Sequence, residues 1–173
     1  QDFKRNFARA RFSPRTSNHP IVRQWTYEGS IDYITDNNNV LESRDVTGEF
    51  RMDFHNSDSF SVEYHRLYEL LTKSFKVSKN VRIAPGGYGF NNLSVSYTAG
   101  SQYRLSGTTT FETGSFYDGD KKTARFRGRL EITPQLGLEP NISLNWVDLP
   151  SGSFTNTVVG ARSVFTMTPR MFV

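Results

Sequence analysis

The sequence predicts an all-β fold, an antiparallel meander of about nine strands. Apolar and polar residues alternate with period two through most of the chain, which places them on opposite faces of each strand. Residues that favour turns separate these stretches, and no window approaches the ~18 consecutive apolar residues of a membrane-spanning helix. Aromatic residues make up 14% of the 173 residues, a content that suits strands.

The alternation is clearest between residues 123 and 147, where two strands flank Thr133-Pro134-Gln135. Proline has no backbone N–H to donate, so Pro134 belongs to the connection. We call every second residue of a strand, which together occupy one of its faces, a parity. The apolar parity consists of Ala124, Phe126, Leu130, Ile132, Leu136, Leu138, Ile142, Leu144 and Trp146. The opposite parity holds Arg125, Arg127, Arg129, Glu131, Glu139, Asn141, Ser143 and Asn145. Three arginines in one row are hard to bury in a soluble core but easily hydrated on the wall of a water-filled lumen.

The same reasoning assigns the other strands in chain order. The expected strands are 3–12, 21–35, 40–54, 60–70, 93–99, 103–112, 123–132, 136–147 and 157–168, and Phe172 begins a tenth. Turn-forming residues separate them at 13–20, at 36–39 and at 55–58. We expect 72–89 to be irregular, Gly100-Ser101 to form a two-residue turn, and 114–122 and 148–153 to be loops.

The lengths of the connections indicate a membrane barrel. Short connections, three of which contain Ser-Pro or Thr-Pro, alternate with longer ones at 72–89, 113–122 and 148–153, with 36–39 a short exception. Tight turns at one end and long loops at the other are typical of outer-membrane barrels. The odd number of strands and the abrupt ends predict that residues 1–173 are a single-domain segment of an incomplete barrel, from a longer chain. Its sheet edges would need covering by other barrel strands or protein subunits.

Composition narrows the function classes. The net charge of +4 is modest and gives no reason to expect a nucleic-acid partner. The chain has no cysteine, so we expect neither a disulfide framework nor a thiolate metal site. His65 lies beside Glu63 without any nucleophile motif, and Asp118-Gly119-Asp120 lacks the remaining ligands of a calcium loop. We therefore predict no catalytic residues, no metal and no cofactor, and no enzyme.

The charged parity supplies the candidate lumen residues. They are Arg51, Arg104, Glu112, Arg125, Arg127, Arg129 and Glu131. Rows of arginine can attract anionic solutes into a pore. Alternatively, the arginines pair across strands with Glu112, Glu131, Glu49 and Glu63 as a structural ladder, and the mixture of both signs favours the ladder.

The apolar parity supplies the candidate membrane-facing residues. They are Trp25, Tyr27, Phe50, Phe126, Leu144 and Trp146. Tryptophan and tyrosine are typical of the interfacial girdles of membrane barrels, although the same residues would suit the core of a soluble sandwich. The basic residues between Lys73 and Arg82 either contact lipopolysaccharide phosphates or form an ordinary hydrated loop, the simpler interpretation.

Several stretches resemble bacterial proteins that contain a carbohydrate-binding family 9 domain, in their C-terminal region of unknown function. The matching stretches are 10–15 (ARFSPR), 68–71 (YELL), 86–88 (GGY), 115–119 (SFYDG), 133–136 (TPQL), 143–150 (SLNWVDLP) and 167–173 (MTPRMFV). The resemblance implies a β-barrel region in the outer membrane of a Gram-negative cell. It brings no catalytic motif, and the family's carbohydrate-binding-like module is missing from this chain.

Together these patterns predict an outer-membrane barrel segment that acts as a pore scaffold or as the membrane anchor of a carbohydrate-binding-like module. Its partners would be the lipid bilayer and lipopolysaccharide. The alternative is a soluble antiparallel barrel or sandwich that binds a small apolar or glycan ligand, with its apolar parity turned inward. The two hypotheses differ in whether the apolar parity is exposed or buried within the protein.

Overall fold

The computed structural model describes residues 3–78, 81–150, 152–168 and 171–172, and these residues form strands, turns and bends without any helix. The strands are β1 (Phe3–Phe12), β2 (Val22–Asp36), β3 (Leu41–Phe54), β4 (Ser59–Leu71), β5 (Phe75–Ser78), β6 (Val81–Ile83), β7 (Gly86–Ala99), β8 (Leu105–Phe116), β9 (Gly119–Glu131), β10 (Leu136–Leu149), β11 (Gly152–Thr168) and β12 (Met171–Phe172). The described part of the chain contains no helix long and apolar enough to cross a membrane.

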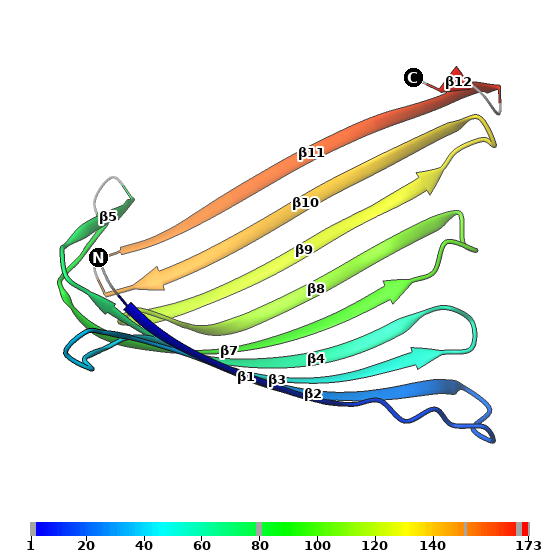
Figure 1. Cartoon of the computed structure of the whole chain (residues 1–173). Helices are drawn as coiled ribbons and strands as arrows, with labels where there is room; N and C mark the ends of the chain where they lie inside the picture. The colour runs from blue at the N-terminus through cyan, green and yellow to red at the C-terminus, as the bar shows by residue number, and fades with distance from the viewer. Residues whose placement is uncertain (1–2, 79–80, 151, 169–170, 173) are drawn as a thin grey trace.

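The main sheet is an antiparallel meander that is not closed into a barrel. Its order is β1-β2-β3-β4-β7-β8-β9-β10-β11-β12, without pairing between β1 and β11, and Figure 1 shows a curved sheet in which these two strands diverge toward the right of the view. β12 consists of two residues and turns back antiparallel on β11. The predicted all-β meander, its nine long strands and the start of a tenth are therefore confirmed.

The cross-strand register places each parity on one face of the whole sheet. One row of directly paired residues carries apolar and threonine side chains: Trp25, Met52, Phe60, Tyr97, Thr109, Phe126, Ile142 and Val159. A row of the other parity is polar: Glu28, Glu49, Glu63, Ser94, Glu112, Thr123, Asn145 and Asn156. We call the faces that contain these rows the apolar face and the polar face.

The buried core is small. Within the described residues, the buried hydrophobic side chains are Val22, Ile83, Phe90, Val147 and Leu149. Ile83, on β6, packs with Val147 and Leu149 on the polar-face parity of β10. The β5–β6 hairpin thus covers an apolar cluster at one end of the polar face, and Figure 1 shows β5 beside that end of the sheet.

Three connections differ from the sequence prediction. The expected loop at 114–122 is a two-residue turn, because the alternation continues through Gly114 and Phe116 to pair with residues of β9. Tyr117 takes a φ of 56°, and two-residue hairpin turns of types I′ and II′ need a positive φ at this position. The expected loop at 148–153 is shortened in the same way, because Asp148 and Leu149 pair with Ser153 and Gly152.

The segment 72–89 also holds more structure than expected. It contains the β5–β6 hairpin and the first residues of β7, and the other long connection in the described part of the chain is 13–21, between β1 and β2 at the opposite end of the sheet. The contrast between tight turns and long loops is therefore weaker than the sequence indicated. We call the end with connections 37–40, 72–85 and 117–118 the hairpin end, and the end with 55–58, 100–104 and 132–135 the turn end.

Candidate functional site

The polar face carries a group of cations on β9 and β11, which are separated by β10. Glu112 accepts from Arg125 at 3.3 Å and lies 3.8 Å from Lys121, so one carboxylate serves two cations. Glu139 is shared in the same way, at 2.6 Å from Arg162 and 3.7 Å from Arg129. The cations outnumber their carboxylates, and the region keeps a positive excess. We define the basic region as Lys121, Arg125, Arg127, Arg129 and Arg162.

Arg127 differs from its neighbours in the row. Its cross-strand neighbours are Thr108 on β8 and Asn141 on β10, both uncharged, and no ion pair joins it to any described residue. It borders a hollow of about 370 Å³ that Glu139 and Arg162 also line. Arg127 is therefore the cation of this row that is best placed to meet an anion from solution.

The opposite part of the polar face is acidic. The register sets Glu49 directly between Glu28 and Glu63, and Asp32 directly opposite Asp45. We define these five carboxylates as the acidic region. Like charges in direct opposition destabilise a sheet unless cations intervene.

Arginines of the edge strand β1 reduce this repulsion. Arg5 lies 2.5 Å from Asp32, and Arg9 lies 2.6 Å from Glu28. His65 Nε2 lies 2.9 Å from Glu63, and its Nδ1 lies 3.1 Å from the Thr47 hydroxyl and 3.6 Å from Asp45. Between the two charged regions, β7 and β8 present hydroxyls, with Ser96 bonded to Thr110.

The predicted arginine ladder exists in part. Arg125 pairs with Glu112 as expected, but Arg129 and Arg162 pair with Glu139, and Glu131 makes no ion pair within the described residues. Arg51 pairs with Asp53 on its own strand, at 3.0 Å, rather than with Glu49 or Glu63.

Arg104 was placed wrongly. The expected two-residue turn at Gly100-Ser101 is a longer connection, so Arg104 precedes β8 instead of lying on its polar face. Its carbonyl accepts from the Glu131 amide at 2.7 Å. Gln102 and Tyr103 hold this connection in place through Asn56 and Asp58 of the neighbouring turn, which is the physical reason that the strand starts later than expected.

Asp58 joins these two connections at the turn end. It is 3% exposed, and it accepts from the Tyr97 hydroxyl at 2.6 Å, the Gly100 amide at 2.8 Å and the Asn56 side chain at 2.9 Å. The hydrogen bond from Tyr97, and then that from Gly100, lowers the pKa of the Asp58 carboxyl below its ordinary value. No signal in the sequence distinguished Asp58 from an ordinary turn aspartate.

The six candidate membrane-facing residues all lie on the apolar face. Tyr27 pairs with Phe50, Leu144 lies opposite Ala124, and the others occupy rows of the same parity. Tyr27 and Trp146 are 49% and 43% exposed, and the remaining four are half-buried. No described residue packs over this face to bury them.

Two arginines on the apolar face were not singled out in the sequence. Arg44 lies between Tyr33 and Tyr68 on the neighbouring strands, and Arg66 lies between Val46 and Asn91. The Nε of Arg44 is buried without a hydrogen-bond partner, the one such side-chain atom among the described residues. The interruption of an apolar parity by arginine was the available signal.

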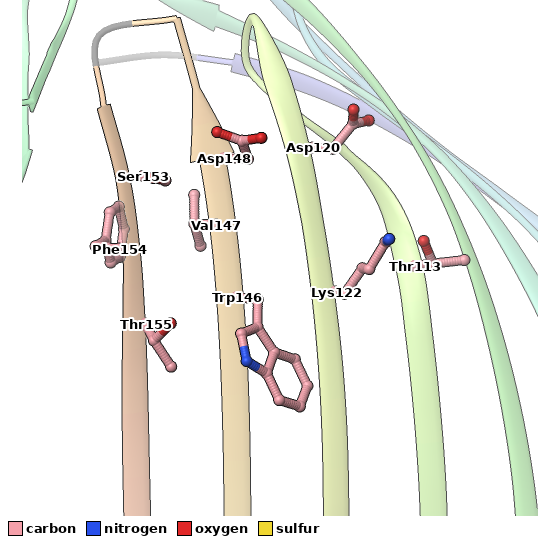
Figure 2. Close-up of a pocket in the computed structure, with 9 residues that line it drawn as sticks. All are labelled: Thr113, Asp120, Lys122, Trp146, Val147, Asp148, Ser153, Phe154 and Thr155. Carbon is pink, nitrogen blue, oxygen red and sulfur yellow. The ribbon is translucent and has the colours of Figure 1, made fainter.

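The described residues contain no cluster of three or more His, Asp or Glu side chains that could hold a metal ion. A hollow of about 730 Å³ lies at the hairpin end. Figure 2 shows its lining, in which Asp120 and Asp148 lie opposite each other near the turns. Lys122 and Trp146 form the next row, and Ser153 and Thr155 line the hollow from β11.

Comparison with known proteins identifies no relative. No family model, no curated protein and no solved structure matches this chain.

Proposed function

We propose that this chain is a wall segment of an outer-membrane β-barrel, with its apolar face toward lipid and its polar face toward an aqueous lumen. In this role the chain scaffolds a pore or anchors a carbohydrate-binding-like module, and no residue performs chemistry. The observation that carries the proposal is the separation of the two parities from β2 to β10 while the apolar face stays largely uncovered. A soluble protein rarely leaves so large an apolar surface exposed.

The outline of the apolar surface gives independent support. Trp25 on β2, Phe126 on β9 and Ile142 on β10 lie in one cross-strand row. Toward the turn end, the apolar residues of β2 stop at this row, whereas those of β9 and β10 continue six residues beyond it, to 132 and 136. At the hairpin end the limit of the apolar residues is also displaced toward the turn end, from Tyr33 on β2 to Ala124 on β9, because Lys122 and Asp120 follow there. The apolar band therefore crosses the sheet obliquely.

Strand tilt accounts for this oblique band. A shift of six residues corresponds to about 20 Å along a strand, and the five steps from β2 to β9 correspond to about 24 Å across the sheet. The resulting angle is about 40°, within the range of strand tilts in membrane barrels. A band of constant height around a tilted barrel must cross the strands obliquely in this way, whereas a soluble core imposes no such outline.

The polar face suits a hydrated lumen. Its ion pairs leave the cations largely exposed, as with Arg125 at 49% and Arg162 at 74% of their side-chain surface. The partner carboxylates Glu112 and Glu139 are less exposed, at 19% and 28%. Guanidinium groups that extend beyond their carboxylates can contact water and anionic solutes.

The test measures the environment of two adjacent positions on β9. Single cysteines replace Phe126 and Arg127 in the reconstituted chain, each carrying the same fluorophore, and one water-soluble and one lipid-soluble quencher are applied. We expect the lipid-soluble quencher to act on position 126 and the water-soluble one on position 127. Labels at Ile142 and Asn141, their cross-strand neighbours on β10, provide matched controls.

Shielding of position 126 from both quenchers would overturn the proposal, because the apolar face would then be a protein core. The soluble β protein with an inward apolar ligand site would replace it. Quenching of both positions from water would also contradict a membrane wall.

A further inference from the structure

We propose that Arg44 and Arg66 form a binding site for the phosphate of an anionic lipid head group. This inference rests on the proposed membrane orientation and adds a specific lipid contact to it. The site lies on the apolar face at the hairpin end, on the neighbouring strands β3 and β4.

The position of the two arginines along their strands is the first step. Going toward the hairpin end, the apolar parity of β3 runs through Phe50 and Val46 before it reaches Arg44. On β4 it runs through Val62 and Tyr64 to Arg66, and Tyr68 and Leu70 follow. In a membrane wall, Arg44 would therefore lie at the edge of the apolar band, the level at which head-group phosphates lie. Arg66 lies opposite Val46, two residues nearer the middle of the band, and its long side chain can extend to the same level.

The lack of protein partners is the second step. Neither arginine forms an ion pair with any described residue, in contrast to Arg125, Arg129 and Arg162 on the polar face. The Nε of Arg44 is buried and unpaired. Glu42, the acid two residues along β3, makes no ion pair with Arg44. A buried donor without a partner costs free energy, so no protein contact accounts for the position of this guanidinium group.

The neighbouring side chains are the third step. Tyr33 and Tyr68 lie directly opposite Arg44 on the two adjacent strands, and Tyr64 precedes Arg66 on β4. Tyr64 donates to Asn91 Oδ1 at 3.1 Å, so its ring is held beside Arg66. Tyrosines at an apolar boundary are typical of the membrane interface. Two guanidinium forks among them suit a phosphate, which arginine binds in a bidentate manner.

The occupant is a lipid with a phosphate head group, because apolar surface, interfacial tyrosines and unpaired guanidinium groups occur together here.

The experiment uses the 173-residue chain in detergent micelles and measures bound lipid by native mass spectrometry. The probes are diphosphorylated lipid A, the same lipid after enzymatic removal of its phosphates, and inorganic phosphate as competitor. We expect the phosphorylated lipid to bind more tightly, and Arg44→Gln and Arg66→Gln each to weaken it about fivefold. Inorganic phosphate should compete only weakly, because it has no acyl chains.

Arg5→Gln is the control, because Arg5 also lies at the hairpin end but on the polar face, where it pairs with Asp32. It should leave lipid binding unchanged. Arg44→Lys keeps the positive charge but lacks the two-pronged guanidinium group, so its affinity for the phosphorylated lipid should lie between those of the wild type and Arg44→Gln. This variant keeps the test decisive if Arg44→Gln does not fold. Equal binding of both forms of lipid A, or wild-type binding by Arg44→Gln and Arg66→Gln, would overturn the inference. Quenching at position 126 is measured on the same samples, so a failure of membrane orientation is seen separately.

Discussion

The acidic region and the basic region of the polar face share one alternation pattern but arrange their charges differently. In the basic region Arg125, Arg127 and Arg129 follow one another along β9, about 6.8 Å apart. In the acidic region Glu28, Glu49 and Glu63 lie side by side across three strands, where side chains are about 5 Å apart. Charges along one strand can each pair with a neighbouring strand, whereas charges across strands repel directly.

This difference shows that register, rather than composition, decides which charges oppose one another. The arginines of β9 have Glu112 on one side and Glu139 on the other. The central acid Glu49 has carboxylates on both sides, while Arg5 and Arg9 of β1 pair with Asp32 and Glu28 beside it. The polar face therefore carries an excess of cations on β9 and β11 and a cluster of carboxylates on β2, β3 and β4 that β1 offsets in part, separated by the hydroxyls of β7 and β8.

The largest expected effect is a reversal of charge preference between the two regions. A cysteine at Asn141, beside Arg127, should react faster with an anionic methanethiosulfonate than with a cationic one, and a cysteine at Thr47, beside His65, should show the opposite preference. The ratio of the two rates should differ about tenfold between the sites and should shrink as salt increases. Equal ratios at both sites would contradict the division into two regions.

The second prediction concerns Asp58, which lies between β3 and β4 at the turn end. Its pKa is lowered in the folded state, so its contribution to stability is complete above the ordinary Asp pKa of about 3.9 and is lost as pH falls through the folded value. Urea unfolding at a series of pH values should show this acid destabilisation. Asp58→Asn should be less stable at neutral pH and should lose that part of the pH dependence, whereas the exposed Asp118→Asn should behave as wild type.

The third prediction concerns the carboxylate shared in the basic region. Glu139→Gln should lower the free energy of unfolding by about 1 kcal/mol, because Arg129 and Arg162 both lose their partner. Equilibrium denaturation measures the change. Glu131→Gln removes a carboxylate without a recorded ion pair and should have almost no effect. A similar loss in both variants would show that net charge, and not the specific pair, matters.

The smallest expected effect is in the acidic region and has the opposite sign. Glu49→Gln removes the carboxylate between Glu28 and Glu63 and should raise the free energy of unfolding by a few tenths of a kcal/mol, about 0.3. The gain should be visible as a shift in the urea midpoint at low salt and should diminish at high salt. A loss of stability on this substitution would mean that Glu49 has a stabilising contact.

The sequence predicted the strands well because alternation is a local property. β1 has the expected bounds, and those of β2, β3 and β4 lie within one residue of expectation, whereas β7, β9 and β11 begin several residues earlier than expected. The connection at Tyr117 was missed because Gly, Asp and Lys residues suggested a loop although the alternation continued through them. A turn of two residues leaves little compositional signal.

The candidate site was less predictable because it depends on which strands pair and in which register. Local alternation placed Arg125 and Arg129 on the polar face but could not identify Glu139 as a shared partner. Asp58 and the unpaired Nε of Arg44 depend on contacts between separate strands. Arg104 was misplaced because its connection is held by side chains of another turn.

The meander order also bears on how the sheet assembles. Each strand of the main sheet pairs with the strand that precedes it in the chain, except that β4 pairs with β7 across the β5–β6 hairpin. Such local pairing gives a low contact order, so the sheet can grow hairpin by hairpin without long loop closures. The pairing of Leu71 with Gly86, which closes the longest loop, is then the slowest step of growth and divides assembly into an early and a late half.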